Sequence, residues 1–149
     1  MSTRPAGGPD TVVLIHGLWL NGKSWEGWKA RYEARGYTVI AESWPGMDDV
    51  AALREDSSAV EHLGIAEIVD HYAEIISALD RPPIIMGHSF GGAFTEILLD
   101  RGLGAAGVAI DAAAVKGITK LPLSTLRSAW PVLKSPANRH KTVMLSPEE

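Results

Sequence analysis

The sequence predicts an α/β fold in which a parallel sheet carries helices on both faces. Short apolar runs rich in β-branched residues alternate along the chain with segments whose apolar residues recur at helical spacing. The resulting order is strand, helix, strand, helix, strand, helix, strand, and parallel strands joined by helices need that arrangement. The chain has 149 residues, of which 46% are hydrophobic and 21% charged, so it is long enough for one ordinary domain.

Four segments have the length and composition of buried strands. They are residues 11–15, 37–41, 84–86 and 106–110. The first stops at His16-Gly17 and the last stops at Asp111, and both ends lead into loops. Because all the strands are expected to be parallel, these loops fall on one edge of the sheet.

Helices are expected between these strands. The clearest has about four turns, because its apolar residues fall three and four positions apart; they are Ile68, Val69, Tyr72, Ile75, Ile76 and Leu79. An earlier helix begins with Ser24 as its cap and ends at Gly36, and its Trp25 and Trp28 are expected in the core. A weakly patterned helix over residues 51–63 follows a turn at Pro45-Gly46.

Composition and charge exclude several classes of protein. The net charge is −4, whereas non-specific nucleic-acid binding needs a concentrated basic face. No apolar run approaches the roughly 18 residues that span a bilayer, and residues 1–10 lack the apolar core of a signal peptide. We therefore expect a cytoplasmic protein that binds neither nucleic acid nor membrane.

The sequence also argues against a metal or another cofactor. It has no cysteine, which excludes disulfides and thiolate metal sites. Glu42, Asp48 and Asp49 follow the second strand, but no histidine or cysteine stands at ligand spacing with them. We interpret these carboxylates as solvated loop and helix-cap residues.

Gly87-His88-Ser89-Phe90-Gly91 matches the G-x-S-x-G motif in the context that the motif requires, between a buried strand and a helix. The glycines are needed because the turn at the serine is strained and larger side chains would collide with neighbouring elements. Ser89 is thereby a candidate nucleophile at the carboxyl edge of the sheet. It also lies at a helix N-terminus, where the Phe90 N–H can stabilise an oxyanion. His88 is expected to pack or to orient its neighbours.

A second oxyanion donor is expected in the loop after the first strand, HGLW at residues 16–19. Leu18 would offer its N–H, and Gly17 would let the backbone approach the substrate. Trp19 is a candidate wall of the substrate pocket. His16 is expected to be a structural histidine that bonds nearby backbone.

The segment HGLWLNGKSW, followed about seventy residues later by GHSFGG, resembles the α/β-hydrolase superfamily, in its branch of single-domain serine esterases and cofactor-free haloperoxidase-like enzymes. The resemblance implies Ser89 as the nucleophile and the N–H groups of Leu18 and Phe90 as the oxyanion hole. It implies cleavage of a small ester, thioester, lactone or amide through an acyl-enzyme at Ser89. It also divides the chain into residues 1–111, the N-terminal half of the hydrolase core, and residues 112–149, the start of a helical cap.

The chain departs from this family after its last expected strand. In these enzymes an acid and then a histidine follow the serine on loops after later strands, so the fold is expected to be truncated before those strands. His140 is the only histidine after Ser89, in a segment that resembles the cap. Asp111 is either the acid, as in some lipase-type members, or a strand-end residue that caps the next turn.

Three readings of function follow from this departure. Because a serine without a base is a poor nucleophile, a hydrolase of this kind is expected to be weak or inactive as the isolated chain. The alternatives are an inactive hydrolase-like binding or interaction module, and a minimal enzyme that uses His140. The strand that ends at Asp111 would be an open sheet edge, which favours self-association.

Overall fold

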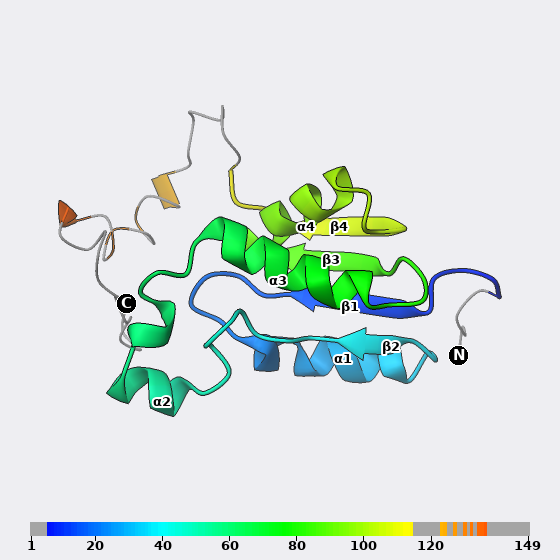
Figure 1. Ribbon diagram of the computed structural model, residues 1–149, viewed down its shortest axis with the longest axis horizontal. Helices are drawn as coiled ribbons and strands as arrows, with labels where there is room; N and C mark the ends of the chain where they lie inside the picture. Colours follow the sequence, from blue (N-terminus) through cyan, green and yellow to red (C-terminus); the bar gives the residue numbers. More distant parts are fainter. Residues whose placement is uncertain are drawn as a thin grey trace.

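The computed structural model describes residues 6–114, together with residues 123, 124, 127, 130, 132 and 134–136. Within these residues four parallel strands form one sheet, in the order β2-β1-β3-β4 (Figure 1). The strands are β1 (Thr11–Ile15), β2 (Thr38–Ile40), β3 (Ile84–His88) and β4 (Ala106–Ile110). The expected α/β class is confirmed, because the four apolar runs form strands and the segments between them form helices. The last run was expected to be buried, but Ala106–Ala109 of β4 are exposed, since β4 is the edge strand of the described sheet.

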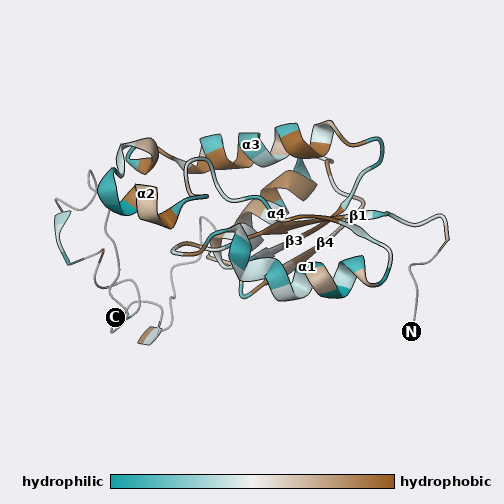
Figure 2. Ribbon diagram, turned by 90° about the horizontal axis from the view of Figure 1, so that it is seen from below, coloured by the Kyte–Doolittle hydropathy of each residue, from teal (hydrophilic) through white to brown (hydrophobic). Residues whose placement is uncertain are grey.

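Helices cover both faces of this sheet. One face is covered by α1 (Glu26–Glu33), which follows the 3-10 helix Gly22–Trp25, and the other by α3 (Ile65–Ser77) and α4 (Phe90–Asp100). The short α2 (Val50–Glu55) and the 3-10 helix Ser58–Val60 lie in the connection between β2 and α3 and bury no residues of their own. Figure 2 shows α1 on one side of the sheet and α3 with α4 on the other. None of the described helices is long and apolar enough to cross a membrane.

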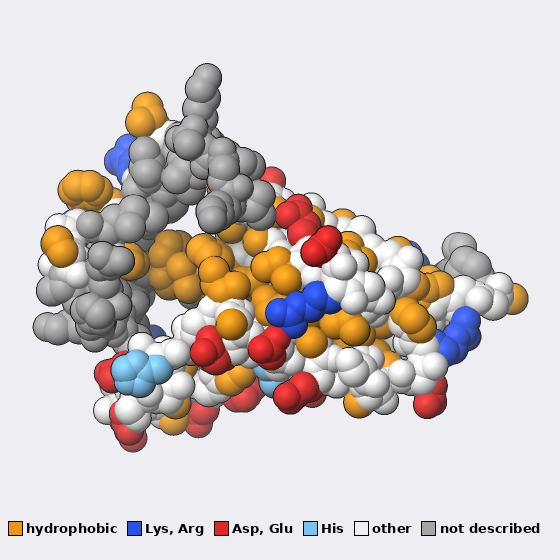
Figure 3. Space-filling view, turned by 45° about the horizontal axis from the view of Figure 1, so that its top comes forward, with side chains coloured by type: hydrophobic (Ala, Val, Ile, Leu, Met, Phe, Trp, Pro, Cys, Tyr) orange, Lys and Arg blue, Asp and Glu red, His pale blue; other side chains and the backbone are white. Residues whose placement is uncertain are grey.

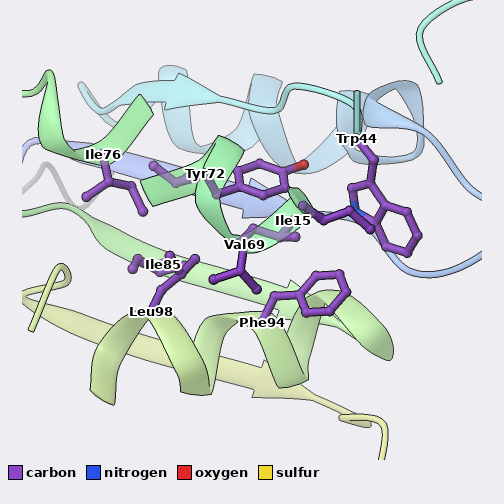
Figure 4. Packing of buried hydrophobic residues seen from close by; sticks show 10 residues of the cluster. Ile15, Trp44, Val69, Tyr72, Ile76, Ile85, Phe94 and Leu98 are labelled. Atoms are coloured by element: carbon purple, nitrogen blue, oxygen red, sulfur yellow. The ribbon is translucent and has the colours of Figure 1, made fainter. Parts of the chain in front are cut away.

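The larger core lies between the sheet and the pair α3 and α4. Val69 and Tyr72 of α3 meet Ile15 and Ile85 of the sheet, and Phe94 of α4 closes the cluster beside Trp44 (Figure 4). The apolar stripe predicted on α3 is therefore the face that it buries. A smaller cluster on the α1 side packs around Trp25.

The first helix begins differently from the expectation. Asn21, and not Ser24, provides the side-chain cap: it caps the 3-10 helix Gly22–Trp25 by accepting the Lys23 N–H at 3.1 Å, and α1 follows with Trp25 at its N-cap and no side-chain cap of its own. Ser24 instead donates its hydroxyl to the Asn21 carbonyl at 2.8 Å. Trp28 was expected in the core but is 42% exposed, because no described segment covers that part of α1.

Residues 51–63 do not form one helix. The segment contains α2 and the short 3-10 helix Ser58–Val60, with extended backbone at Asp56 between them. Polar side chains that bond nearby backbone compete with the helix here, since Asp56 accepts the Ser58 N–H at 2.9 Å. Asp49 caps α2, as expected, by accepting the Ala51 and Ala52 N–H groups.

Two features are relevant to binding partners: the distribution of charge on the surface and the unpaired edge of the sheet. On the face seen in Figure 3, acidic side chains are spread out and the Lys and Arg side chains do not gather in one patch. In the described part of the chain, β4 pairs with β3 alone, so its other edge is open. Val108 of β4 is 44% exposed.

Candidate active site

Ser89 occupies the turn between β3 and α4 in a strained backbone conformation. Its φ is 55° and its ψ is −119°, a combination that costs a non-glycine residue about 1–3 kcal/mol. The neighbouring glycines make the turn fit. A Cβ on Gly87 would meet the Gly91 carbonyl, and a Cβ on Gly91 would meet the Ile15 and His16 carbonyls. The reason given for the glycines of the motif is therefore confirmed.

Backbone strain gathers at the edge of the sheet that holds Ser89. Among the described residues, the non-glycine positions with positive φ are Trp19 at 67°, Ser89 at 55° and Asp111 at 43°. Each follows a strand at its carboxyl end, namely β1, β3 and β4. Such strain persists only where the surroundings enforce it, and it concentrates at functional sites.

The end of β4 holds the backbone of the serine. The Ser89 N–H donates to the Ile110 carbonyl at 3.0 Å, and the Ser89 carbonyl accepts the Ala113 N–H at 2.9 Å. Asp111 lies between these two contacts with its side chain exposed. The structure thus places Asp111 beside the serine turn, where both interpretations of this residue remain open.

The two predicted oxyanion donors flank the serine. Phe90 is the first residue of α4, so its N–H belongs to the turn of the helix that has no intrahelical acceptors. Gly17 lies against the serine, since a Cβ on Gly17 would stand 3.0 Å from the Ser89 Cβ. Leu18 follows directly and is 37% exposed. The roles of these N–H groups stay predictions.

His16 is buried, with no exposed surface, and both ring nitrogens bond backbone. Its Nδ1 lies 2.9 Å from the Gly17 carbonyl oxygen, and its Nε2 accepts the Trp44 N–H at 3.0 Å. The ring stacks on Trp44 with centroids 4.8 Å apart. Burial lowers the pKa of His16, against smaller opposing effects of the Gly17 hydrogen bond and the Asp48 charge. The expected structural role is confirmed, and the histidine is not free to act as a base.

Trp44 is the residue of this region that sequence reasoning missed. It is buried and bridges two parts of the site, because its ring also lies 5.4 Å from that of Phe94 on α4. An aromatic residue in the loop after β2 was the available signal. Its hydrogen-bond partner His16 is 28 positions away in the sequence, however, and no spacing rule connects these two residues.

The other described histidines form no hydrogen bond with the serine hydroxyl. His88 faces the α1 side, where it lines an apolar groove together with Leu20, Ser24, Trp25, Trp28 and Ile110. Trp19, the predicted pocket wall, is exposed on the loop and is not among these lining residues. Within the described part of the chain no histidine is hydrogen-bonded to Ser89, and His140 lies outside it.

Acidic and histidine side chains do not converge on a metal site in this part of the molecule. Among the described residues, no group of three or more His, Cys, Asp or Glu side chains is placed to hold a metal ion. Of the carboxylates in the loop after β2, that of Asp49 caps α2.

Comparison with known proteins assigns the family. Residues 12–148 match the model of the alpha/beta hydrolase family, so the chain belongs to that family. No curated protein matches the sequence.

Several solved structures share the fold. An extracellular alpha/beta-hydrolase from a Paenibacillus species, described as a structural and functional homologue of tobacco salicylic acid binding protein 2, is 24% identical with a TM-score of 0.67, over 93% of this chain and 56% of that one. Polyneuridine aldehyde esterase is 18% identical with a TM-score of 0.58, over 95% and 56%. A pyrethroid hydrolase is 23% identical with a TM-score of 0.61, over 72% and 42%. The chain therefore spans about half the length of these proteins.

Proposed function

We propose that the protein is a serine hydrolase that cleaves a small ester, thioester, lactone or amide through an acyl-enzyme at Ser89. The observation that carries this proposal is the conformation of Ser89, which is held with positive φ between β3 and α4 by two glycines that accept no side chain. A serine on such a turn stands clear of the sheet edge with helix N–H groups beside it.

The reaction is acyl transfer. Ser89 Oγ attacks the substrate carbonyl carbon while its proton passes to a base, and the oxyanion that forms accepts hydrogen bonds from the Leu18 and Phe90 N–H groups. Collapse of this intermediate expels the alcohol, thiol or amine with a proton and leaves the acyl group on Ser89. Water then repeats the attack and releases the acid. The base is a histidine outside the described residues, because His16 is fully engaged with backbone and none of the other described histidines is hydrogen-bonded to Ser89.

The surroundings of the serine favour a small, largely apolar acyl substrate. Leu18, Trp19 and Leu20 expose apolar side chains on the loop beside Ser89, without a charged residue among them. Two of the similar structures are named as an esterase and a pyrethroid hydrolase, which agrees with ester substrates. No cofactor is needed for this chemistry.

The experiment that tests this function is hydrolysis of p-nitrophenyl acetate and butyrate, with Ser89→Ala as the control. We expect turnover that the substitution abolishes, at a low rate for the 149-residue chain. Equal rates for both proteins would refute the assignment.

A binding module is the second candidate, because the described residues contain no histidine bonded to Ser89. In this case a folded chain would retain an ester at the serine without cleaving it. Saturable binding of a non-hydrolysable ether analogue with no turnover of the matching ester would favour this candidate.

A further inference from the structure

We propose that His16 is a positioning residue that aims the Leu18 N–H of the oxyanion hole by holding the peptide group between Gly17 and Leu18. This inference rests on the proposed function for its catalytic meaning. The orientation of this one peptide group is tested by measurements that need no enzymatic turnover.

The peptide group between Gly17 and Leu18 is held through its carbonyl oxygen. The Gly17 carbonyl and the Leu18 N–H belong to the same planar trans unit, so they point in opposite directions. The His16 Nδ1 lies 2.9 Å from the Gly17 oxygen, and the Leu20 N–H also donates to this oxygen, at 3.3 Å. Holding the oxygen on one side of the plane fixes the direction of the Leu18 N–H on the other.

The second step concerns which nitrogen of His16 carries the proton. The Trp44 N–H donates to Nε2 at 3.0 Å, so Nε2 must be unprotonated. The neutral ring then has its proton on Nδ1, which makes Nδ1 the donor to the Gly17 carbonyl. The backbone of the loop after β2 therefore selects the tautomer that orients the loop after β1.

The third step is that this arrangement is rigid. His16 is wholly buried and stacks on Trp44, which is itself buried and packs against Phe94 of the serine helix. A Cβ on Gly17 would stand 3.0 Å from the Ser89 Cβ and 3.1 Å from the His88 carbonyl oxygen, so the loop after β1 lies close to the serine turn. The orienting histidine, the N–H that it aims and the nucleophile thus share one packed unit, which is the condition for a preorganised oxyanion hole.

Two substitutions separate the bonds of His16. In His16→Asn the side-chain amide can replace Nδ1 as the donor to Gly17, but it does not reach Trp44. In His16→Gln the amide oxygen can replace Nε2 as the acceptor from Trp44, and the donor to Gly17 is lost. Ser43→Ala is the control, since it removes another bond between the segments that follow β1 and β2, from the Gly22 N–H to Ser43 Oγ, and does not involve the Gly17 peptide.

The first measurement is nuclear magnetic resonance of the folded chain. We expect a neutral His16 with its proton on Nδ1, and a Leu18 N–H residual dipolar coupling that is unchanged in His16→Asn and Ser43→Ala but altered in His16→Gln. A proton on Nε2, or a Leu18 coupling that is the same in His16→Gln as in the wild type, would overturn the proposal. If the variants fail to fold, the tautomer and the Leu18 coupling of the wild-type chain still decide it.

The second measurement links the geometry to the chemistry. The rate of modification of Ser89 by a fluorophosphonate is expected to fall about 100-fold in His16→Gln, as for the loss of an oxyanion donor, and to stay within about threefold in His16→Asn. Equal losses in both variants would mean that His16 only stabilises the fold. Absence of modification in the wild type would count against the proposed function, while the dipolar couplings would still report on the peptide.

Discussion

Gly91 of the serine turn lies directly against the carbonyl oxygen of Ile15, so the helix that follows the nucleophile packs on the end of β1 with no room for a side chain. The His16 carbonyl stands on the same side. The close approach brings the serine turn and the loop with the predicted oxyanion donor into one unit.

Replacing Gly91 with alanine tests this packing. The added methyl group would overlap two backbone oxygens, which cannot move as a flexible side chain does, so we expect a loss of about 3 kcal/mol or more in the free energy of unfolding. Gly27→Ala on α1 is the matched control, because a Cβ there meets nothing within 4 Å. It should leave stability unchanged or raise it by up to about 1 kcal/mol. Urea denaturation followed by circular dichroism measures both, and equal stabilities would contradict the packing.

Two substitutions of Asp111 separate the effect of its backbone conformation from the effect of its carboxylate. Its φ of 43° suits asparagine and glycine but not alanine. We expect Asp111→Asn to keep both stability and the reactivity of Ser89, and Asp111→Ala to lose about 1 kcal/mol of stability. If Asp111→Asn instead stays fully stable while Ser89 loses its reactivity, the carboxylate is the catalytic acid.

The pKa of His16 predicts how stability depends on pH. Burial lowers this pKa below its usual value of 6.5, so the unfolded chain takes up a proton at a higher pH than the folded chain does. The stability is therefore complete above pH 6.5 and decreases as the pH falls from there toward the folded pKa. Thermal unfolding between pH 8 and pH 5 should show this decrease, and it should be smaller in His16→Gln, whose side chain does not titrate. The same slope in both proteins would assign the effect to other groups.

The open edge of β4 predicts self-association. Val108 is exposed on this strand, and an unpaired strand edge is a template for pairing with another chain. We expect sedimentation velocity to show association that grows with concentration and that Val108→Lys suppresses, because a lysine on an edge strand opposes pairing. Ala78→Lys, an exposed position at the end of α3 with the same change in charge, should associate as the wild type does.

The sequence predicted the strands and the serine turn because both depend on local patterns. The buried β-branched run of β1 indicates a strand, and G-x-S-x-G indicates a backbone that only its glycines permit. The start of the first helix was less predictable, since Asn21 and Ser24 are both good caps. In the structure the Asn21 side chain accepts the Lys23 N–H, and the Ser24 hydroxyl donates to the Asn21 backbone carbonyl.

Contacts between distant segments could not be predicted in this way. Trp28 fits the same helical stripe as Trp25, yet only Trp25 is buried, because burial depends on what covers the helix. The bond from the Trp44 N–H to His16 joins loops that follow different strands. Its existence depends on the order of those strands in the sheet, which the spacing of residues does not reveal.

The central claim, that Ser89 is a nucleophile on a preorganised turn, is tested most directly by intact mass after exposure to a fluorophosphonate, once circular dichroism has established that the wild-type chain and Ser89→Ala are both folded. The account predicts one adduct per chain that forms slowly and is absent from Ser89→Ala. An adduct that persists in Ser89→Ala, or no adduct on the folded wild-type chain after prolonged exposure, would contradict it.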